Sequence, residues 1–360
     1  MDNLSLTFSA SELLCRGKGF TYDDVCLVPK RSSISSRSHP LLTSRLTRNH
    51  TIDLPLISSN MDTISEKEMC QSMAKLGAVG SLHRFMSMEE QVAQVHAIAT
   101  FQQQERIKTP IAASIGVKEE GARRAEKLIE AGAQILTIDI AHGDSDLMLE
   151  TLRWIKKEFP HVDVIAGNVA TPTAVKGLID AGADAIKVGI GPGSMCTTRL
   201  IAGCGVPQLT AVSWCAQETK KANIPLIADG GLRTSGDIMK ALAAGADTVM
   251  LGSMLAGTLE TPGELQAGFK VYRGMASKDA QVSWRGDLPE GMAPEGVSSK
   301  VACKGSVHHV IKEIAGGIRS GMTYLNLNSL LEDNREDIHF IEMSYSGRLE
   351  SGPHGLTGKS

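Results

Sequence analysis

Short apolar runs alternate with amphipathic segments along most of the chain, and this alternation limits the folds that the chain can adopt. Each run is closed by glycine, asparagine or aspartate, which is typical of buried strands. Eight runs are found, at 54–60, 78–83, 111–116, 134–141, 163–169, 185–191, 225–231 and 248–254. The segments 119–130, 146–158 and 234–244 lie between such runs and have the pattern of crossover helices between parallel strands.

An internal repeat supports this interpretation. The stretches "LIEAGAQILTIDI", "LIDAGADAIKVGI" and "ALAAGADTVMLGS" each pass from the end of a helix through Ala-Gly-Ala into a strand. Glycine suits the left-handed cap that ends a helix before a short turn. Eight βα units predict a single (β/α)8 TIM barrel, and an open doubly wound sheet is the alternative.

The barrel is expected to span residues 18–330, after an N-terminal extension at 1–17. It includes a mobile flap at about 276–300, rich in glycine, proline and charge, and a final helix in "VHHVIKEIAGGIRSGM". Residues 331–360 form a C-terminal segment, in which "SGPHGLTGKS" is interpreted as a frayed tail. No insertion is long enough for a regulatory domain.

Charge and cysteine usage exclude several classes of protein. The net charge of −3 provides no field that would gather nucleic acid or an anionic membrane. No run approaches the length of a spanning helix, and the first twenty residues lack a signal-peptide pattern. The seven cysteines are scattered without a CxxC pair or metal-ligand spacing, so we expect a reducing, cytoplasmic location.

In a barrel of this type, chemistry gathers at the carboxyl ends of the strands. The polar residues that close the predicted strands are Asn60, His83, Asp139, Asn168, Asp229 and Ser253. The last two strands end in the glycine-rich turns "DGG" and "LGS", which can expose backbone N–H groups to a phosphate. Asp229 could accept hydrogen bonds from ribose hydroxyls. The alternative is that the glycines only fit tight turns, and flavin mononucleotide barrels share the pattern.

A cysteine stands in the glycine-rich stretch "GIGPGSMCTTR". An exposed thiol on such a loop can be activated by nearby dipoles or cations, which makes Cys196 the candidate nucleophile. Thr198 could relay a proton, and carbonyls of the loop could bind a monovalent cation. Cys204 lies in the same loop but lacks flanking hydroxyls. The remaining cysteines are predicted to be buried and structural: Cys15, Cys26, Cys70, Cys215 and Cys303.

The cysteine loop, together with "NMDT", "DIAHG", "AGNVAT", "DGGLR", "LGSMLAG" and "YRGM", resembles the family of inosine monophosphate dehydrogenase and guanosine monophosphate reductase. The resemblance covers about residues 17–330, with the motifs in the family's order. It implies a (β/α)8 barrel that binds a purine mononucleotide and a nicotinamide dinucleotide and attacks purine C2 with the cysteine. It also implies a homotetramer.

The resemblance assigns roles by matching position. The phosphate would be held by Ser194, Gly231, Gly252, Ser253 and Tyr272, and the ribose by Asp229. The purine would lie against Ser58, Met61, Gly274, Met275 and Ala276. The nicotinamide dinucleotide would lie near Arg84, Asp139, Ala141 and Asn168. A potassium ion would be bound by the carbonyls of Gly191, Gly193 and Cys196.

Three features bear on which of the family's two reactions to expect. About 27 residues join the second and third strands, which leaves no room for the domain pair that dehydrogenases usually insert. The flap holds one arginine, Arg285, and no tyrosine, so it lacks the dehydrogenases' water-activating pair. Glu295 follows Met275 by twenty residues, the reductase spacing of the glutamate that works with Thr198 to release ammonia.

These features predict reductive deamination of GMP to IMP with NADPH, with Cys196, Thr198 and Glu295 as catalytic residues. "NMDT" and "LHRF" also favour a reductase, whereas "YRGM" and "APEG" are closer to a dehydrogenase. Met292 stands where reductases have an arginine. The alternatives are a dehydrogenase that oxidises IMP to XMP with NAD, using Arg285 alone, and a nucleotide-binding barrel without catalysis.

Overall fold

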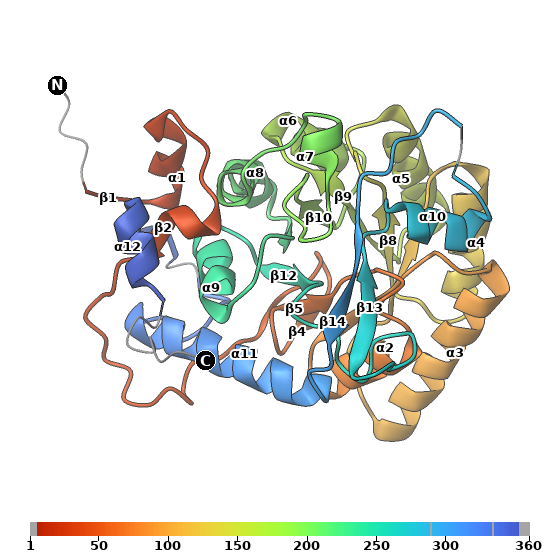
Figure 1. Ribbon diagram of the computed structural model, residues 1–360, viewed down its shortest axis with the longest axis horizontal. Helices are drawn as coiled ribbons and strands as arrows, with labels where there is room; N and C mark the ends of the chain where they lie inside the picture. The colour runs from red at the N-terminus through yellow and green to blue at the C-terminus, as the bar shows by residue number, and fades with distance from the viewer. Residues whose placement is uncertain (1–5, 289, 333–334, 353–360) are drawn as a thin grey trace.

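Eight parallel strands close into a barrel in the computed structural model, which describes residues 6–352 except 289 and 333–334 (Figure 1). The strands are β5 (Leu56–Ser58), β6 (Val79–Leu82), β7 (Ala112–Ile115), β8 (Ile135–Asp139), β9 (Asp163–Val169), β10 (Ala185–Val188), β11 (Leu226–Asp229) and β12 (Thr248–Leu251). They neighbour each other in chain order, and β12 pairs with β5 to close the ring. The predicted (β/α)8 barrel is confirmed, and each of the eight predicted strands forms one strand of the barrel.

Helices alternate with these strands and surround the barrel (Figure 1). They are α2 (Lys67–Lys75), α3 (Met88–Glu105), α4 (Lys118–Glu130), α5 (Asp146–Glu158), α6 (Pro172–Asp180), α7 (Thr198–Ile201), α8 (Gln208–Ala222), α9 (Ser235–Ala243) and α11 (Val307–Tyr324). The segments predicted as crossover helices correspond to α4, α5 and α9. The segment predicted as the final helix forms α11, but it is not the last one, because α12 (Tyr345–Glu350) follows it. Gly132, in the turn before β8, has a φ of 110°, a conformation that side chains other than glycine rarely adopt.

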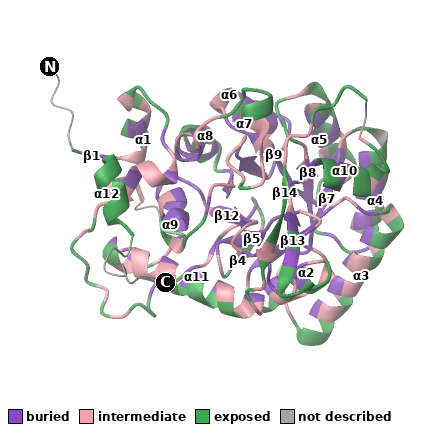
Figure 2. Cartoon of the chain, viewed as in Figure 1, coloured by how far each residue is buried: buried purple, intermediate pink, exposed green. Residues whose placement is uncertain are grey.

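Two apolar cores stabilise the barrel, one inside it and one between its strands and the helices (Figure 2). Each strand contributes one side chain to the inner layer: Ile57, Val79, Ala112, Ile135, Ile165, Ala185, Ile227 and Met250. Leu46 and Ile52, from the hairpin of β3 (Ser44–Arg45) and β4 (Thr51–Ile52), complete this layer. The interior is therefore packed at the amino ends of the strands.

The two ends of the described chain pack against each other. Strand β15 (Phe340–Glu342) lies between β1 (Thr7–Phe8) and β2 (Val25–Leu27) in an antiparallel sheet. The rings of Phe8 and Phe340 stack with centroids 6.2 Å apart. The sequence pattern did not predict this sheet. Helix α12 (Tyr345–Glu350) follows it, and most of the expected tail, 353–360, lies outside the described residues.

The predicted flap contains regular structure. Helix α10 (Lys278–Arg285) occupies its first part. Strand β14 (Ser298–Ala302) then returns antiparallel to β13 (Phe269–Arg273), as Figure 1 shows. The mobility of this flap remains a prediction. Within the described part of the chain, no helix has the length and apolar character needed to cross a membrane.

Asp163 fixes the β3–β4 hairpin to the barrel. Its buried carboxylate accepts hydrogen bonds from Thr47 Oγ1 at 2.5 Å, Asn49 Nδ2 at 2.7 Å and His50 Nδ1 at 2.9 Å. Burial by itself would raise the pKa of Asp163, but the hydrogen bonds from His50, Thr47 and Asn49 outweigh it and hold that pKa well below its ordinary value.

We predict that Asp163→Asn lowers the free energy of unfolding by about 2 kcal/mol at pH 7, because charged hydrogen bonds are lost. A lowered folded-state pKa stabilises the protein above the unfolded-state pKa of about 4 and ceases to do so as the pH falls through the folded value. The difference from wild type should therefore shrink below about pH 4. Urea unfolding at several pH values measures this, with Asp180→Asn, at an exposed pair, as the control. A pH-independent difference would contradict the prediction.

Candidate active site

A buried lysine links three strands at the carboxyl end of the barrel. Lys187, on β10, has a side chain that is 2% exposed. Its Nζ lies 3.3 Å from Asp139 Oδ1 at the end of β8 and 3.0 Å from Asp229 Oδ2 at the end of β11, and it donates to Asn168 Oδ1 on β9. Asn168 Nδ2 also donates to Asp229 Oδ2 at 2.9 Å. Four adjacent strands thus share one hydrogen-bond network.

The charged groups of this network stabilise each other in their ionised forms. Burial lowers the pKa of Lys187, but Asp229 and Asp139 raise it more, so the net shift of that pKa is upward. Burial raises the pKa of Asp139, but Lys187 and Arg84 lower it more, so its net shift is downward. The lysine therefore stays protonated and Asp139 ionised at neutral pH. The sequence analysis missed Lys187, although a lysine within the apolar run "AIKVGIG" was a signal for it.

The cysteine loop follows β10 and begins the short helix α7. Cys196 is partly buried, and its Sγ donates to Thr198 Oγ1 at 3.1 Å. Arg199 NH2 donates to the carbonyl of Val206 at 2.6 Å and holds the loop against the segment that follows. A Cβ at Gly191 would lie 2.5 Å from Arg199 Cγ, so glycine is required there. The sequence thus places the thiol beside a hydroxyl on a loop supported by an arginine.

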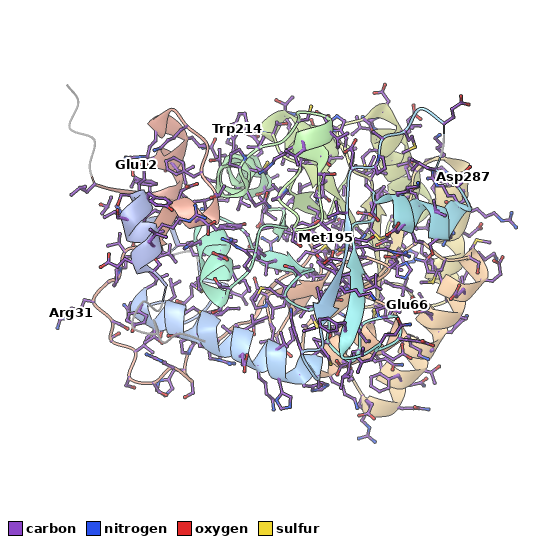
Figure 3. All side chains as sticks on the ribbon, in the orientation of Figure 1. Glu12, Arg31, Glu66, Met195, Trp214 and Asp287 are labelled. Atoms are coloured by element: carbon purple, nitrogen blue, oxygen red, sulfur yellow. The ribbon has the colours of Figure 1, made fainter. Side chains whose placement is uncertain are left out.

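Backbone hydrogen bonds connect this loop to the flap. Thr197 N donates to Glu295 O at 3.0 Å, and Glu295 N donates to Ala276 O at 3.0 Å. Val297 N donates to Met195 O at 3.0 Å. Met195 is labelled near the centre of Figure 3. Glu295 therefore lies in a strand-like segment between the cysteine loop and the start of the flap.

These elements enclose a cavity of about 350 Å³. It brings together most of the residues that the sequence predicts as a site: Met61, Arg84, Asp139, Ala141, Asn168, Gly191, Gly193, Ser194, Cys196, Thr198, Asp229, Tyr272, Gly274, Met275, Ala276 and Glu295. The lining also includes Ser59, Lys187, Gln281 and Met292, to which the sequence analysis gave no role in the site. The candidate nucleophile Cys196 and the candidate acid–base residues Thr198 and Glu295 thus line one cavity.

A second cavity of about 230 Å³ lies next to the first, with Ser194 lining both. It contains the predicted phosphate residues Gly231 and Ser253. Tyr22 also lines it, and its hydroxyl is buried without a hydrogen-bond partner. The backbone of Gly231, the hydroxyls of Ser194 and Ser253 and the unpaired hydroxyl of Tyr22 are groups that fit a phosphate.

Two predicted ligand residues line neither cavity. Ser58 is fully buried, with its Oγ 2.6 Å from Ser65 Oγ, and the neighbouring Ser59 faces the cavity instead. Gly252 lies behind Tyr272, because a Cβ there would come 3.0 Å from the tyrosine hydroxyl oxygen. His83 is also internal, and its ring contacts Glu66 Oε1 and the backbone N–H of Phe85.

The other cysteines differ in part from the prediction. Cys70 and Cys215 are buried, and burial raises the pKa of both thiols, to about 12 for Cys215. Cys15 is exposed, and Cys26 and Cys303 are partly exposed, so their predicted burial was wrong. They lie in or beside short peripheral elements, where the apolar pattern carries little information on depth.

Among the described residues, 6–352 without 289, 333 and 334, no group of three or more histidine, cysteine, aspartate or glutamate side chains is placed so that it could hold a metal ion. A site made of backbone carbonyls would not be found in this way. The carbonyl of Gly193 accepts one hydrogen bond, from Cys196 N at 3.0 Å, and keeps a second lone pair. The loop carbonyls therefore remain compatible with a monovalent cation.

A closed parallel barrel with a cysteine, a threonine and a glutamate at its carboxyl end, beside a cavity that fits a phosphate, defines the class of barrel enzymes that act on phosphorylated ligands. The model of the IMP dehydrogenase / GMP reductase domain matches residues 19–354. The chain belongs to this family of oxidoreductases, whose members bind purine mononucleotides and use nicotinamide cofactors.

Dehydrogenases and reductases of this family are both similar to the protein over nearly its whole chain. An inosine-5'-monophosphate dehydrogenase of Cryptosporidium parvum is 42% identical, over 94% of this chain and 96% of that protein. A GMP reductase of Leishmania donovani is 34% identical, over 94% of this chain and 97% of that protein. The crystal structure of a cysteine-to-alanine variant of GMP reductase from Trypanosoma brucei, in complex with guanosine 5'-monophosphate, superposes with a TM-score of 0.88 at 34% identity, covering 96% of this chain and 100% of that one.

We predict that Lys187→Met lowers the free energy of unfolding by about 3 kcal/mol at pH 7, because the partly buried carboxylates of Asp139 and Asp229 lose the cation that they share. Protonation of a carboxylate relieves this, so the deficit should narrow as the pH falls from 7 towards 5. Urea unfolding at both pH values measures the effect. Lys176→Met removes an exposed pair and should change little. A wild-type-like stability of Lys187→Met would contradict the assigned network.

Proposed function

We propose that this protein is a GMP reductase, which converts GMP and NADPH to IMP, ammonia and NADP+. The observation that carries the proposal is the contact of Cys196 Sγ with Thr198 Oγ1 at 3.1 Å, in a cavity that Glu295 also lines. Thiol, hydroxyl and carboxylate are the groups needed to attack purine C2 and to protonate a departing amine.

The chain's residues would act in the following order. The thiol of Cys196 passes its proton to the hydroxyl of Thr198 as that hydroxyl passes its own proton to the Glu295 carboxylate, and the sulfur forms a bond to C2 of the guanine. Thr198 and Glu295 then deliver protons to the 2-amino group, so that the C2–N bond breaks and ammonia leaves. A nicotinamide cofactor held on the side of Arg84, Asp139 and Asn168 would supply the hydride that C2 receives. The sulfur–C2 bond then breaks, which regenerates the thiol and gives IMP. With two protons consumed, atoms and charge balance with ammonium as the product.

The competing reaction, oxidation of IMP to XMP with NAD, needs a group that activates water. Arg285, the one arginine of residues 276–300, ends helix α10, is exposed, and is absent from the lining of both cavities. No tyrosine occurs between Met275 and Glu295. The 42% identity to a dehydrogenase favours that reaction as the second candidate, since it exceeds the identity to the reductases.

The rest of the proposal concerns the ligands and the assembly. The phosphate would lie in the smaller cavity against Ser194, Gly231 and Ser253, with Tyr272 at its edge. The ribose would meet Asp229. NADPH would lie on the side of Arg84, Asp139, Ala141 and Asn168, and potassium on the carbonyls of Gly191, Gly193 and Cys196. We propose a homotetramer in the cytoplasm.

The reaction is tested with purified protein in two mixtures that contain potassium, one with GMP and NADPH and one with IMP and NAD+. We predict a fall in absorbance at 340 nm and release of ammonia in the first mixture alone. Cys196→Ala should abolish it, and Cys204→Ala, at an exposed thiol of the same loop, should retain it. A rise in the second mixture alone would establish the dehydrogenase.

The roles of Thr198 and Glu295 are tested separately. We predict that Glu295→Gln and Thr198→Val each lower kcat for GMP by about 10²-fold or more, because proton delivery to the amine is lost. Glu290→Gln changes an exposed carboxylate of the same flap and serves as the matched control. Single-turnover assays with GMP measure the effect, and unchanged kcat in both site variants would remove these residues from the scheme.

A further inference from the structure

The flap helix α10 presents a buried amide to the larger cavity. Gln281 is 8% exposed and lines that cavity. Its Nε2 donates to the carbonyl of Met275 at 2.8 Å. A carbonyl can only accept a hydrogen bond, so the nitrogen must face it and the oxygen must face away. Gln281 Oε1 is buried and has no hydrogen-bond partner.

The position of this amide is fixed by the packing of α10. Ser277 Oγ accepts the N–H of Ala280 at 3.2 Å and caps the helix. Trp284 lies three residues after Gln281, so the two side chains share a face of α10. The Trp284 ring stacks on Phe85, with centroids 5.6 Å apart and planes at 14°. The guanidinium of Arg124 lies 5.8 Å from the Trp284 ring centroid.

Phe85 itself lines the cavity, next to Arg84, whose NH2 donates to the carbonyl of Asp139 at 3.3 Å. Helix α10 is thus packed against Phe85 through Trp284, and Gln281, Phe85 and Arg84 line the same cavity. Met275, Phe85 and Met292, which also line it, offer no strong hydrogen-bond donor. An acceptor left buried without a partner is unfavourable, so a ligand donor that reaches it is bound more tightly.

We propose that Gln281 Oε1 accepts a hydrogen bond from the carboxamide of the nicotinamide ring and thereby positions that ring. The proposal rests on the proposed use of a nicotinamide cofactor at this site. The carboxamide is a planar group with an NH2 donor, and the ring would lie on the side of Arg84 and Asp139. The 2-amino group of guanine is a poorer candidate, because it must leave after Cys196 adds to C2, and a buried acceptor would hold it in place.

The experiment pairs a variant with a cofactor analogue. In reduced 3-acetylpyridine adenine dinucleotide phosphate, a methyl group replaces the carboxamide NH2, so this analogue cannot donate to Gln281. In Gln281→Met, a side chain of similar size removes the acceptor. We predict that Gln281→Met lowers kcat/KM for NADPH about tenfold, corresponding to one hydrogen bond, and leaves kcat/KM for the analogue and KM for GMP unchanged.

The decisive quantity is the ratio of kcat/KM for NADPH to that for the analogue, because a merely structural role of Gln281 would lower both equally. Gln103→Met, at an exposed glutamine of α3, should keep the wild-type ratio. An unchanged ratio in Gln281→Met would overturn the proposal. A rise in KM for GMP alone would instead assign Gln281 to the purine.

Failure of the proposed function can be distinguished from failure of this inference. If the wild type oxidises IMP with NAD+, the same ratio is measured with NAD+ and its 3-acetylpyridine analogue. If neither reaction is seen, calorimetric dissociation constants for NADP+ and its acetylpyridine analogue replace kcat/KM. In either case, loss of the wild-type preference for the carboxamide in Gln281→Met supports the assignment, and its retention contradicts it.

Discussion

The ion-pair network around Lys187 is the interaction on which the carboxyl end of the barrel depends. One ammonium group reaches Asp139, Asn168 and Asp229 and so connects β8, β9, β10 and β11. Charges at this depth are stable only when they are paired and hydrogen-bonded. Below them, Ile135, Ile165, Ala185 and Ile227 fill the barrel interior. The polar layer therefore rests on an apolar one, which gives the cavity floor a fixed set of donors and acceptors.

The second constraint is the backbone connection between the cysteine loop and the flap. Glu295 bonds through its carbonyl to Thr197 and through its N–H to Ala276. Ala276 and Glu295, which are 19 positions apart, are thereby held next to the loop that carries Cys196. The connection uses main-chain groups alone, so the side chain of Glu295 remains free to face the cavity. The same segment positions α10, and through it Gln281 and Trp284.

The sequence pattern predicts the barrel well because a buried parallel strand is a short apolar run closed by turn residues, and this chain has eight of them. It predicts the cysteine loop because glycine and hydroxyl residues are unusual neighbours for a thiol. It does not decide between Ser58, which the resemblance assigns to the purine site, and Ser59, which lines the cavity, since adjacent residues of a strand point to opposite faces and the composition of "LISSN" does not say which one faces inward. It also misses the β1–β15–β2 sheet, whose strands of two or three residues are too short for any period and pair only through the tertiary fold.

Identity over the whole chain is a weak guide to which reaction the site performs. Oxidation of IMP to XMP exchanges hydride for an oxygen at purine C2, and reduction of GMP to IMP exchanges an amine for hydride at the same atom. In the mechanism proposed for this chain and in the competing reaction alike, the same thiol, nucleotide cavity and nicotinamide cofactor would be used, so most residues of the barrel would serve either reaction. The difference lies in the small molecule that must be activated or released, water or ammonia. In the proposed scheme that difference concerns Thr198 on the cysteine loop and Glu295 on the flap, and both residues line the cavity, whereas Arg285 does not. The 42% identity to a dehydrogenase, against 34% to the Leishmania donovani GMP reductase, is therefore compatible with the proposed reduction of GMP.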